Sequence, residues 1–257
     1  MWKEIKKEFS VLSLRQKILW VFTILFTAVG FLAFRKKTLN EQQMIVHIKG
    51  QEGNFFITEK DVKSLVLRIC KAERDSMNEL NIDKIEKALR RHKFVRDVQV
   101  ALNLNGTLII SIEQDQPIAR LISPRGQQGY LSARYTILPL SEYYTPRVVV
   151  LTGNGVDSLF SESFLQSQQS KTFREFLEFI NRDAFWQKQI AQIDIDAKMN
   201  MTLFTLVASP CIEFGRAENY QTKLWKIKRF YEEVLPKVGW NKYNFVNVQY
   251  KNQIICR

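Results

Sequence analysis

The feature that most constrains this chain is an apolar stretch of 17 residues without a charge, which runs from Ile18 to Phe34. As a helix rising about 1.5 Å per residue it spans roughly 25 Å, slightly less than a hydrocarbon core of about 30 Å. Lys17 and Arg35 can extend their charged ends into the headgroup region, and Trp20 lies where an interfacial aromatic side chain is favourable. The alternative is a buried helix of a soluble protein. Such a helix would have to carry apolar residues on every face and a cluster of charges at each end. We therefore expect a single transmembrane anchor over residues 18–34.

The charges that flank this stretch predict its orientation. Five Lys or Arg residues precede it and three follow it. Because the more positive flank tends to stay in the cytoplasm, residues 1–17 are predicted to be cytoplasmic, residues 35–43 a linker, and the rest of the chain periplasmic. The alternative is a cleaved signal peptide, since Ala28-Val29-Gly30 has the small-x-small form of a cleavage site. The apolar run continues past that point to Phe34, which favours an uncleaved anchor.

The net charge of +12 raises the possibility of nucleic-acid binding, so its location along the chain matters. Residues 1–37 contain eight basic and two acidic residues and carry half of the net charge. The other 220 residues carry +6, an ordinary value for their number. Basic residues gathered around one apolar stretch are typical of a membrane anchor, and we expect no nucleic-acid partner.

The cysteines give no metal-binding or disulfide pattern. Cys70, Cys211 and Cys256 are far apart, odd in number and without a CxxC spacing. They are interpreted as three small hydrophobic side chains, although the sequence leaves open that one pair oxidises outside the cytoplasm.

Residues 44–115 have the pattern strand, helix, helix, strand, strand. Apolar and polar residues alternate from Met44 and stop at Gly50, and Thr58 is a good N-cap for a helix with an apolar stripe. A second helix is expected to begin near Asn81 or Asp83. Two alternating runs then flank Asn105-Gly106, which predicts a two-residue hairpin with both turn residues at positive φ.

Residues 116–257 have mixed periodicity, which predicts a second α+β unit with a largely antiparallel sheet. An apolar run ends at Gly153, and short strands are expected at 190–195, 203–207 and 211–214, with a turn at Ser209-Pro210. The spacing of apolar residues predicts one helix around 173–180 and a longer one from Tyr220 that ends at Pro236.

The first unit resembles a POTRA domain in its order of elements. The run from Ile85 to Val100 is similar to the helix-to-strand passage of such domains, and Glu113-x-x-x-Pro117-x-Ala119 resembles the exit from the POTRA domain of the FtsQ/DivIB cell-division family. The chain is therefore identified as an anchor, a POTRA domain over 44–115 and a β-domain over 116–257.

Further landmarks in the second unit are similar to those of the FtsQ/DivIB β-domain, in the same order along the chain. They are Gly129-Tyr-Leu, Ile137-Leu-Pro-Leu, Val149-Val-Leu-Thr-Gly153, Ile212-Glu-Phe-Gly215 and the closing run from Val246 to Ile255. Ser132 and Tyr135 depart from the family pattern, because members often carry Asp and Gly in that turn.

No residue pattern for catalysis stands out. His47 and His92 are the two histidines, and His92 lies among Arg90, Arg91 and Lys93, which disfavours its protonation. Nucleophile, zinc, phosphate and dinucleotide motifs are missing from the sequence. Asp194 and Asp196 are expected on a solvated strand face. We expect no enzyme activity, cofactor, metal or small-molecule substrate.

The expected function is therefore the binding of partner proteins. The last predicted strand, Gln253–Arg257, is a candidate sheet edge that an incoming strand could extend through main-chain hydrogen bonds. In the FtsQ/DivIB family the C-terminal strands and the preceding helix receive a strand of FtsB. The resemblance places Tyr250, Asn252 and Ile254 near that contact, with Trp225 and Phe230 on the helix, where core packing is the alternative for both.

The resemblance implies an essential, non-enzymatic scaffold of the cell-division machinery (divisome) at the septum of the cytoplasmic membrane, with FtsB and FtsL as partners. The alternatives are another membrane-tethered POTRA-type chaperone or secretion adaptor and, third, an enzyme acting on the cell wall.

Overall fold

The computed structural model describes residue 23 and the ranges 43–49, 56–73, 80–207 and 211–257. The predicted cytoplasmic tail, the predicted anchor apart from Thr23, with Ile18, Trp20 and Phe34, and the predicted turn at Ser209-Pro210 lie outside the described residues. Within the described ranges, no helix combines the length and the apolar character that crossing a membrane would require.

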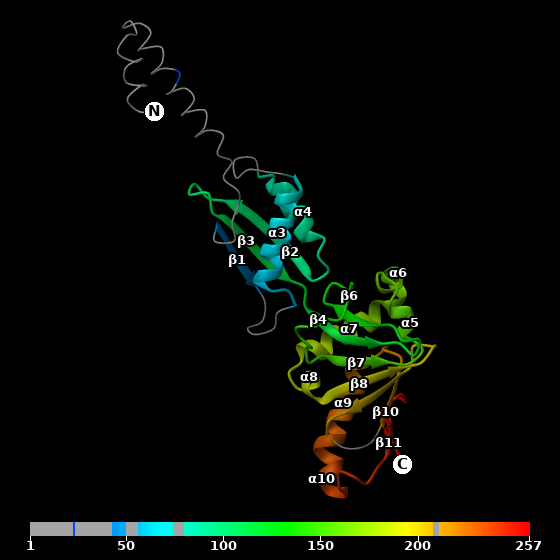
Figure 1. The fold of residues 1–257 in the computed structure, drawn as a ribbon. Coiled ribbons are helices and arrows are strands. Elements are labelled where there is room, and N and C mark those ends of the chain that lie inside the picture. The colour runs from blue at the N-terminus through cyan, green and yellow to red at the C-terminus, as the bar shows by residue number, and fades with distance from the viewer. Residues whose placement is uncertain (1–22, 24–42, 50–55, 74–79, 208–210) are drawn as a thin grey trace, which may run out of the picture.

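The first unit is a three-stranded sheet covered by two helices (Figure 1). Its elements are β1 (Met44–Lys49), α3 (Glu59–Glu73), α4 (Ile82–Arg90), β2 (Val95–Leu102) and β3 (Leu108–Gln114). The strand order is β1-β3-β2, with β1 parallel and β2 antiparallel to the central β3. The predicted strand–helix–helix–hairpin order is therefore confirmed.

Side-chain patterning and capping explain these elements. Met44 and Val46 on β1 face the core that α3 and α4 cover, whereas Ile45 and His47 face away from it. Thr58 accepts a hydrogen bond from the Asp61 N–H at its Oγ1, 3.2 Å away, and the Asp61 carboxylate in turn accepts from the Thr58 N–H, 3.0 Å away. This reciprocal cap satisfies N–H groups that the first helical turn leaves unpaired.

The hairpin turn differs from the prediction. Gly106 has φ of +76°, but Asn105 does not have a positive φ. The Gly106 N–H donates to the Asn103 carbonyl, and the Asn103 side chain accepts from the N–H groups of Asn105 and Thr107. The loop is therefore a longer one, with a single left-handed glycine, because Asn103 supplies acceptors that a two-residue turn would not use. Leu104 is fully exposed at its tip.

The second unit is a nine-stranded mixed sheet in the order β12-β11-β10-β9-β8-β7-β4-β5-β6. Its strands are β4 (Pro117–Ile122), β5 (Gln128–Ser132), β6 (Ile137–Leu138), β7 (Val149–Thr152), β8 (Ile190–Ile195), β9 (Met201–Thr205), β10 (Cys211–Gly215), β11 (Phe245–Asn247) and β12 (Ile255–Cys256). Five of the eight strand pairs are antiparallel. The mixed, largely antiparallel α+β character is as predicted.

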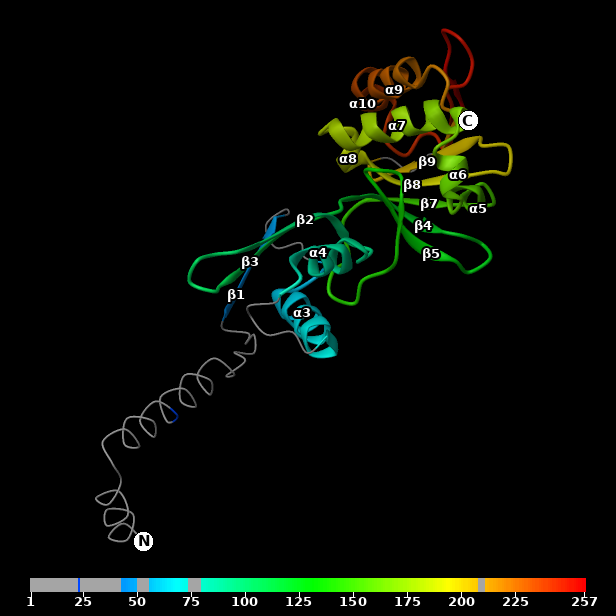
Figure 2. The ribbon, with the colours of Figure 1, turned by 90° about the horizontal axis from the view of Figure 1, so that it is seen from above.

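Helices cover this sheet. They are α5 (Val156–Leu159), α6 (Glu162–Leu165), α7 (Lys171–Arg182), α8 (Trp186–Gln189), α9 (Tyr220–Arg229) and α10 (Leu235–Val238). Figure 2 shows α7 and α9 lying side by side over the sheet. Phe176 of α7 joins the layers, because its ring lies 5.2 Å from that of Phe214 on β10 and 5.9 Å from that of Tyr220 on α9.

The long C-terminal helix does not end at Pro236, contrary to prediction. A π-helical turn, η4 (Phe230–Val234), follows α9, and the short helix α10 continues to Val238. Proline lacks an N–H donor and is tolerated where a helical segment begins. The wider turn makes Pro236 an early residue of a new segment, and Gly239, with φ of +103°, then ends it.

The turn between β5 and β6 explains the departure from the family pattern. Tyr135 has φ of +59°, the conformation that glycine adopts easily, and its buried side chain donates a hydrogen bond to the Glu178 carboxylate on α7, 2.7 Å away. Ser132 is fully buried, and its Oγ accepts from the N–H groups of Arg134 and Thr136. Contacts of the tyrosine with α7 therefore offset the strain of its backbone.

Candidate partner-binding site

The C-terminal strands form one end of the large sheet. β12 is the last strand in the sheet order and pairs antiparallel with β11, which itself runs parallel to β10. In Figure 1 these strands lie at the end of the sheet far from the first unit. The predicted terminal strand is thus an edge strand in the part of the chain that the structure describes.

The register shows which main-chain groups of β12 face outward. Arg257 and Phe245 exchange N–H···O bonds of 3.0 and 3.2 Å, and Cys256 stands opposite Val246. Because hydrogen-bonded and non-hydrogen-bonded pairs alternate in an antiparallel ladder, the N–H and C=O of Cys256 point away from β11. Cys256 therefore carries the outward-facing main-chain groups of β12, which spans Ile255–Cys256.

The predicted contact residues on the helix separate into surface and core. The Trp225 side chain is 57% exposed on α9, and the Arg229 guanidinium lies 5.1 Å from the centre of its ring. Phe230 is 1% exposed and packs among Tyr231 and Tyr243. Of the two interpretations given for Phe230, core packing is the one that the structure shows, so its side chain is not offered to a partner.

The loop between β11 and β12 carries the other predicted residues. Tyr250 is 51% exposed, and Asn252 is exposed with φ of +59°, which turns the chain back toward the sheet. The Ile254 side chain packs partly against the core. Tyr250 and Asn252 are therefore exposed in this loop, whereas Trp225 lines a hollow with Phe179 of α7 and Trp186 of α8.

Sequence reasoning missed a buried lysine beneath this loop. Lys226 of α9 donates hydrogen bonds from its Nζ to the backbone carbonyls of Val248, Tyr250 and Gln253. Its neighbours Ile227 and Phe230 belong to the apolar stripe of the helix, so a lysine at this position borders the buried face. A lysine at the border of a predicted apolar stripe was the sequence feature that could have revealed this buried contact.

Sequence reasoning also missed how the charge is distributed after residue 37. Residues 220–257 contain eight basic and two acidic residues, a net charge of +6, so residues 38–219 have a net charge of zero. The two acidic residues, Glu232 and Glu233, are paired within the helix with Lys228 and Arg229. Counting charge by segment would have shown that the excess positive charge gathers at the β12 end.

None of the three cysteines forms a disulfide. Cys70 is buried in the core of the first unit, and Cys211 and Cys256 lie on β10 and β12 with β11 between them. Two strand spacings of about 4.8 Å exceed the separation of up to about 7 Å that a disulfide allows between Cα atoms. Burial raises the pKa of the Cys256 thiol, which favours its protonated form.

The acidic residues considered for catalysis make structural contacts. Asp194 accepts a hydrogen bond from the Thr152 hydroxyl, 2.8 Å away, between β8 and β7. Asp196 accepts from the N–H groups of Lys198 and Asn200 and closes the turn before β9. Among the described residues, no three His, Cys, Asp or Glu side chains are grouped as a metal site.

A second feature is the junction of the two units. The ring of Phe56, before α3, stacks on Phe94 with centroids 5.0 Å apart and meets the edge of Tyr144, 5.3 Å away, from the β6–β7 loop. The fully buried carboxylate of Asp115 accepts from Arg134 at 2.7 Å across the same junction.

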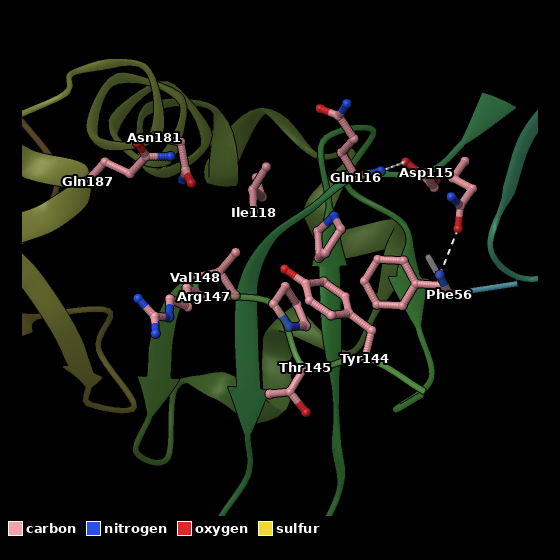
Figure 3. Close-up of a pocket in the computed structure, with 13 residues that line it drawn as sticks. Phe56, Asp115, Gln116, Ile118, Tyr144, Thr145, Arg147, Val148, Asn181 and Gln187 are labelled. Carbon is pink, nitrogen blue, oxygen red and sulfur yellow. Dashed lines mark hydrogen bonds between the residues drawn. The ribbon is translucent and has the colours of Figure 1, made fainter. Parts of the chain in front are cut away.

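Beside these rings lies a hollow of about 590 Å³. Figure 3 shows Tyr144 and Phe56 on one side of it and Asn181 and Gln187 on the other. The Phe56 N–H donates a hydrogen bond of 2.8 Å to the Gln114 side chain. The lining of the hollow combines these aromatic rings with amide side chains and with the charged Asp115 and Arg147.

Comparison with known protein families gives two matches. A family model described as FtsQ/DivIB, C-terminal related, matches residues 116–257, and a model described as POTRA-like domain matches residues 42–113. No curated protein matches the chain. The resemblance inferred from the sequence is thus confirmed.

Proposed function

This chain belongs to the FtsQ/DivIB family of cell-division proteins, and we propose that it is a membrane-anchored, non-enzymatic scaffold that captures divisome partners at the β12 edge. The family acts at the division septum through protein partners. The observation that carries the proposal is the free edge of β12, where the N–H and C=O of Cys256 point outward.

Strand addition explains how this edge would bind. A partner strand beside β12 would satisfy the outward groups of Cys256, and main-chain hydrogen bonds would supply affinity. Tyr250 offers exposed aromatic surface in the loop that leads into β12. The net charge of +6 in residues 220–257 favours an acidic partner segment, because opposite charges steer association. By family resemblance the partners are FtsB and FtsL.

The anchor is the second part of the proposal. The uncharged stretch from Ile18 to Phe34 would hold the chain in the cytoplasmic membrane, with the POTRA and β-domains in the periplasm. Alkaline extraction of isolated membranes tests this arrangement. The chain should stay in the membrane pellet, and its release as a peripheral protein would overturn the anchor.

A matched pair of substitutions at one position tests partner capture. Cys256→Pro removes the outward N–H but no hydrogen bond to β11, and proline is tolerated on such an edge. Cys256→Ala removes the thiol and keeps that N–H. We expect Cys256→Pro to weaken binding of the FtsB–FtsL pair of the same bacterium by about tenfold or more, since a lost bond and an unpaired carbonyl on the partner each weaken the contact.

The pair should be assayed by titration calorimetry on the purified chain and by complementation. Depletion should give filamentous cells, which Cys256→Ala rescues and Cys256→Pro does not. Equal binding by both variants would show that the partner does not use the β12 edge. Normal division after depletion would contradict the divisome function itself and return the other POTRA-type functions to consideration.

A further inference from the structure

The loop that leads into β12 is held from below by one buried lysine. Lys226 is 6% exposed, and its Nζ lies 2.5 Å from the carbonyl oxygen of Val248, 2.6 Å from that of Tyr250 and 3.2 Å from that of Gln253. An ammonium group has three protons, so all three are used. These carbonyls span the segment between β11 and β12, which we call the return loop (residues 248–254).

The three acceptors show which protonation state the site requires. Burial lowers the pKa of Lys226 from its ordinary value. A neutral amine has two protons, however, and would leave one of the three carbonyls without a donor. Hydrogen bonds to the charged form favour that form, so the site is built for the ammonium ion.

The helix that carries Lys226 is packed independently of this contact. Leu224, Ile227 and Phe230 are buried in the β-domain core on the same helical segment. Loss of the ammonium group would therefore release the return loop without unpacking α9. The side chain lies beneath the loop, which leaves Tyr250 and Asn252 exposed above it.

We propose that Lys226 is a positioning residue that fixes the return loop, so that β12 is held against β11 with its outer edge ready for a partner strand. This inference rests on the proposed function of the edge. A pre-ordered edge avoids the conformational entropy cost of ordering the loop during binding. Lys226 would thereby set affinity without touching the partner.

Hydrogen exchange of the full-length chain tests the positioning without any partner. In Lys226→Met the methylene packing is nearly kept but all three donors are lost. We expect the Arg257 amide, which donates to Phe245, to lose about tenfold or more of its protection, because hydrogen bonds from charged donors are among the strongest. Amides of β8 and β9 should change by less than about twofold.

Two further variants make the result specific. Lys228→Met removes the same charge from the same helix and should keep the protection of β12, since Lys228 is half exposed and pairs with Glu232. Lys226→Gln keeps two donors without the charge and should lose part of the β12 protection. It replaces Lys226→Met as the test variant if Lys226→Met does not fold.

Partner binding then completes the test. If the Lys226 variants lose β12 protection and bind the FtsB–FtsL pair about tenfold more weakly, the positioning inference is supported. Unchanged protection of β12 would overturn it. Loss of protection with unchanged binding would keep Lys226 as the anchor of the loop but would show that partners do not use this edge, and the proposed function would fail instead.

Discussion

The aromatic cluster at the junction gives a prediction about how the two units are joined. Phe56 touches rings from both of them, since Phe94 belongs to the POTRA unit and Tyr130 and Tyr144 to the β-domain. Phe56→Ala removes these ring contacts but keeps the backbone hydrogen bond from residue 56 to Gln114. The substitution therefore isolates the side-chain contribution to the coupling of the units.

The expected magnitude follows from burial and from the neighbouring hollow. Truncation of a buried phenylalanine costs about 3–5 kcal/mol, and Phe56 is buried. Because Phe56 also lines the hollow beside Tyr144, water can enter the vacated space, which places the loss at the lower end, about 3 kcal/mol. The substitution should weaken the association of the two units by this amount and leave the stability of each core unchanged.

Hydrogen exchange resolved along the chain measures this loss in both units. We expect faster exchange at two junction amides, that of Asp115, which donates to Phe94, and that of Ala133, which donates to Gln116. Phe176→Ala is the matched control, because Phe176 is fully buried in the β-domain core, away from the junction. It should destabilise the β-domain and leave the POTRA amides unchanged. If Phe56→Ala affects POTRA amides alone, the cluster does not couple the units.

Two more predictions concern stability. Gly153→Ala should lower the free energy of unfolding of the β-domain by about 3 kcal/mol or more in urea titration, because residue 153 has φ of +94° and a methyl group there would collide with the Ile195 backbone; an unchanged midpoint would contradict this reasoning. Burial lowers the pKa of His92, although the Asp61 carboxylate partly opposes that shift, so the unfolded chain binds the proton more readily. POTRA stability should therefore be full above the ordinary histidine pKa of about 6.5 and should fall as the pH drops below it, and the urea midpoint of His92→Gln should lack this pH dependence.

Sequence patterning predicted the elements whose side chains alternate between core and solvent. The alternation in β1 and the apolar spacing of α7 identify a buried face without knowledge of its partner, because burial depends on the period of the element. The order of short motifs likewise led to the correct family. Turn details were less accessible, because the Asn103 side chain and the Tyr135 contact with α7 decide local backbone conformation.

What the sequence determined by itself is the uncharged stretch, the order of the two units and the gathering of positive charge in residues 220–257, because each depends on composition along the chain. Only the tertiary structure decided that Phe230 is core and Trp225 surface, since one helix presents both faces to different neighbours. It also decided that Cys256 directs its backbone outward and that Lys226 holds the loop beside it. The Lys226 contacts join residues more than 20 positions apart, and only the folded structure brings them together.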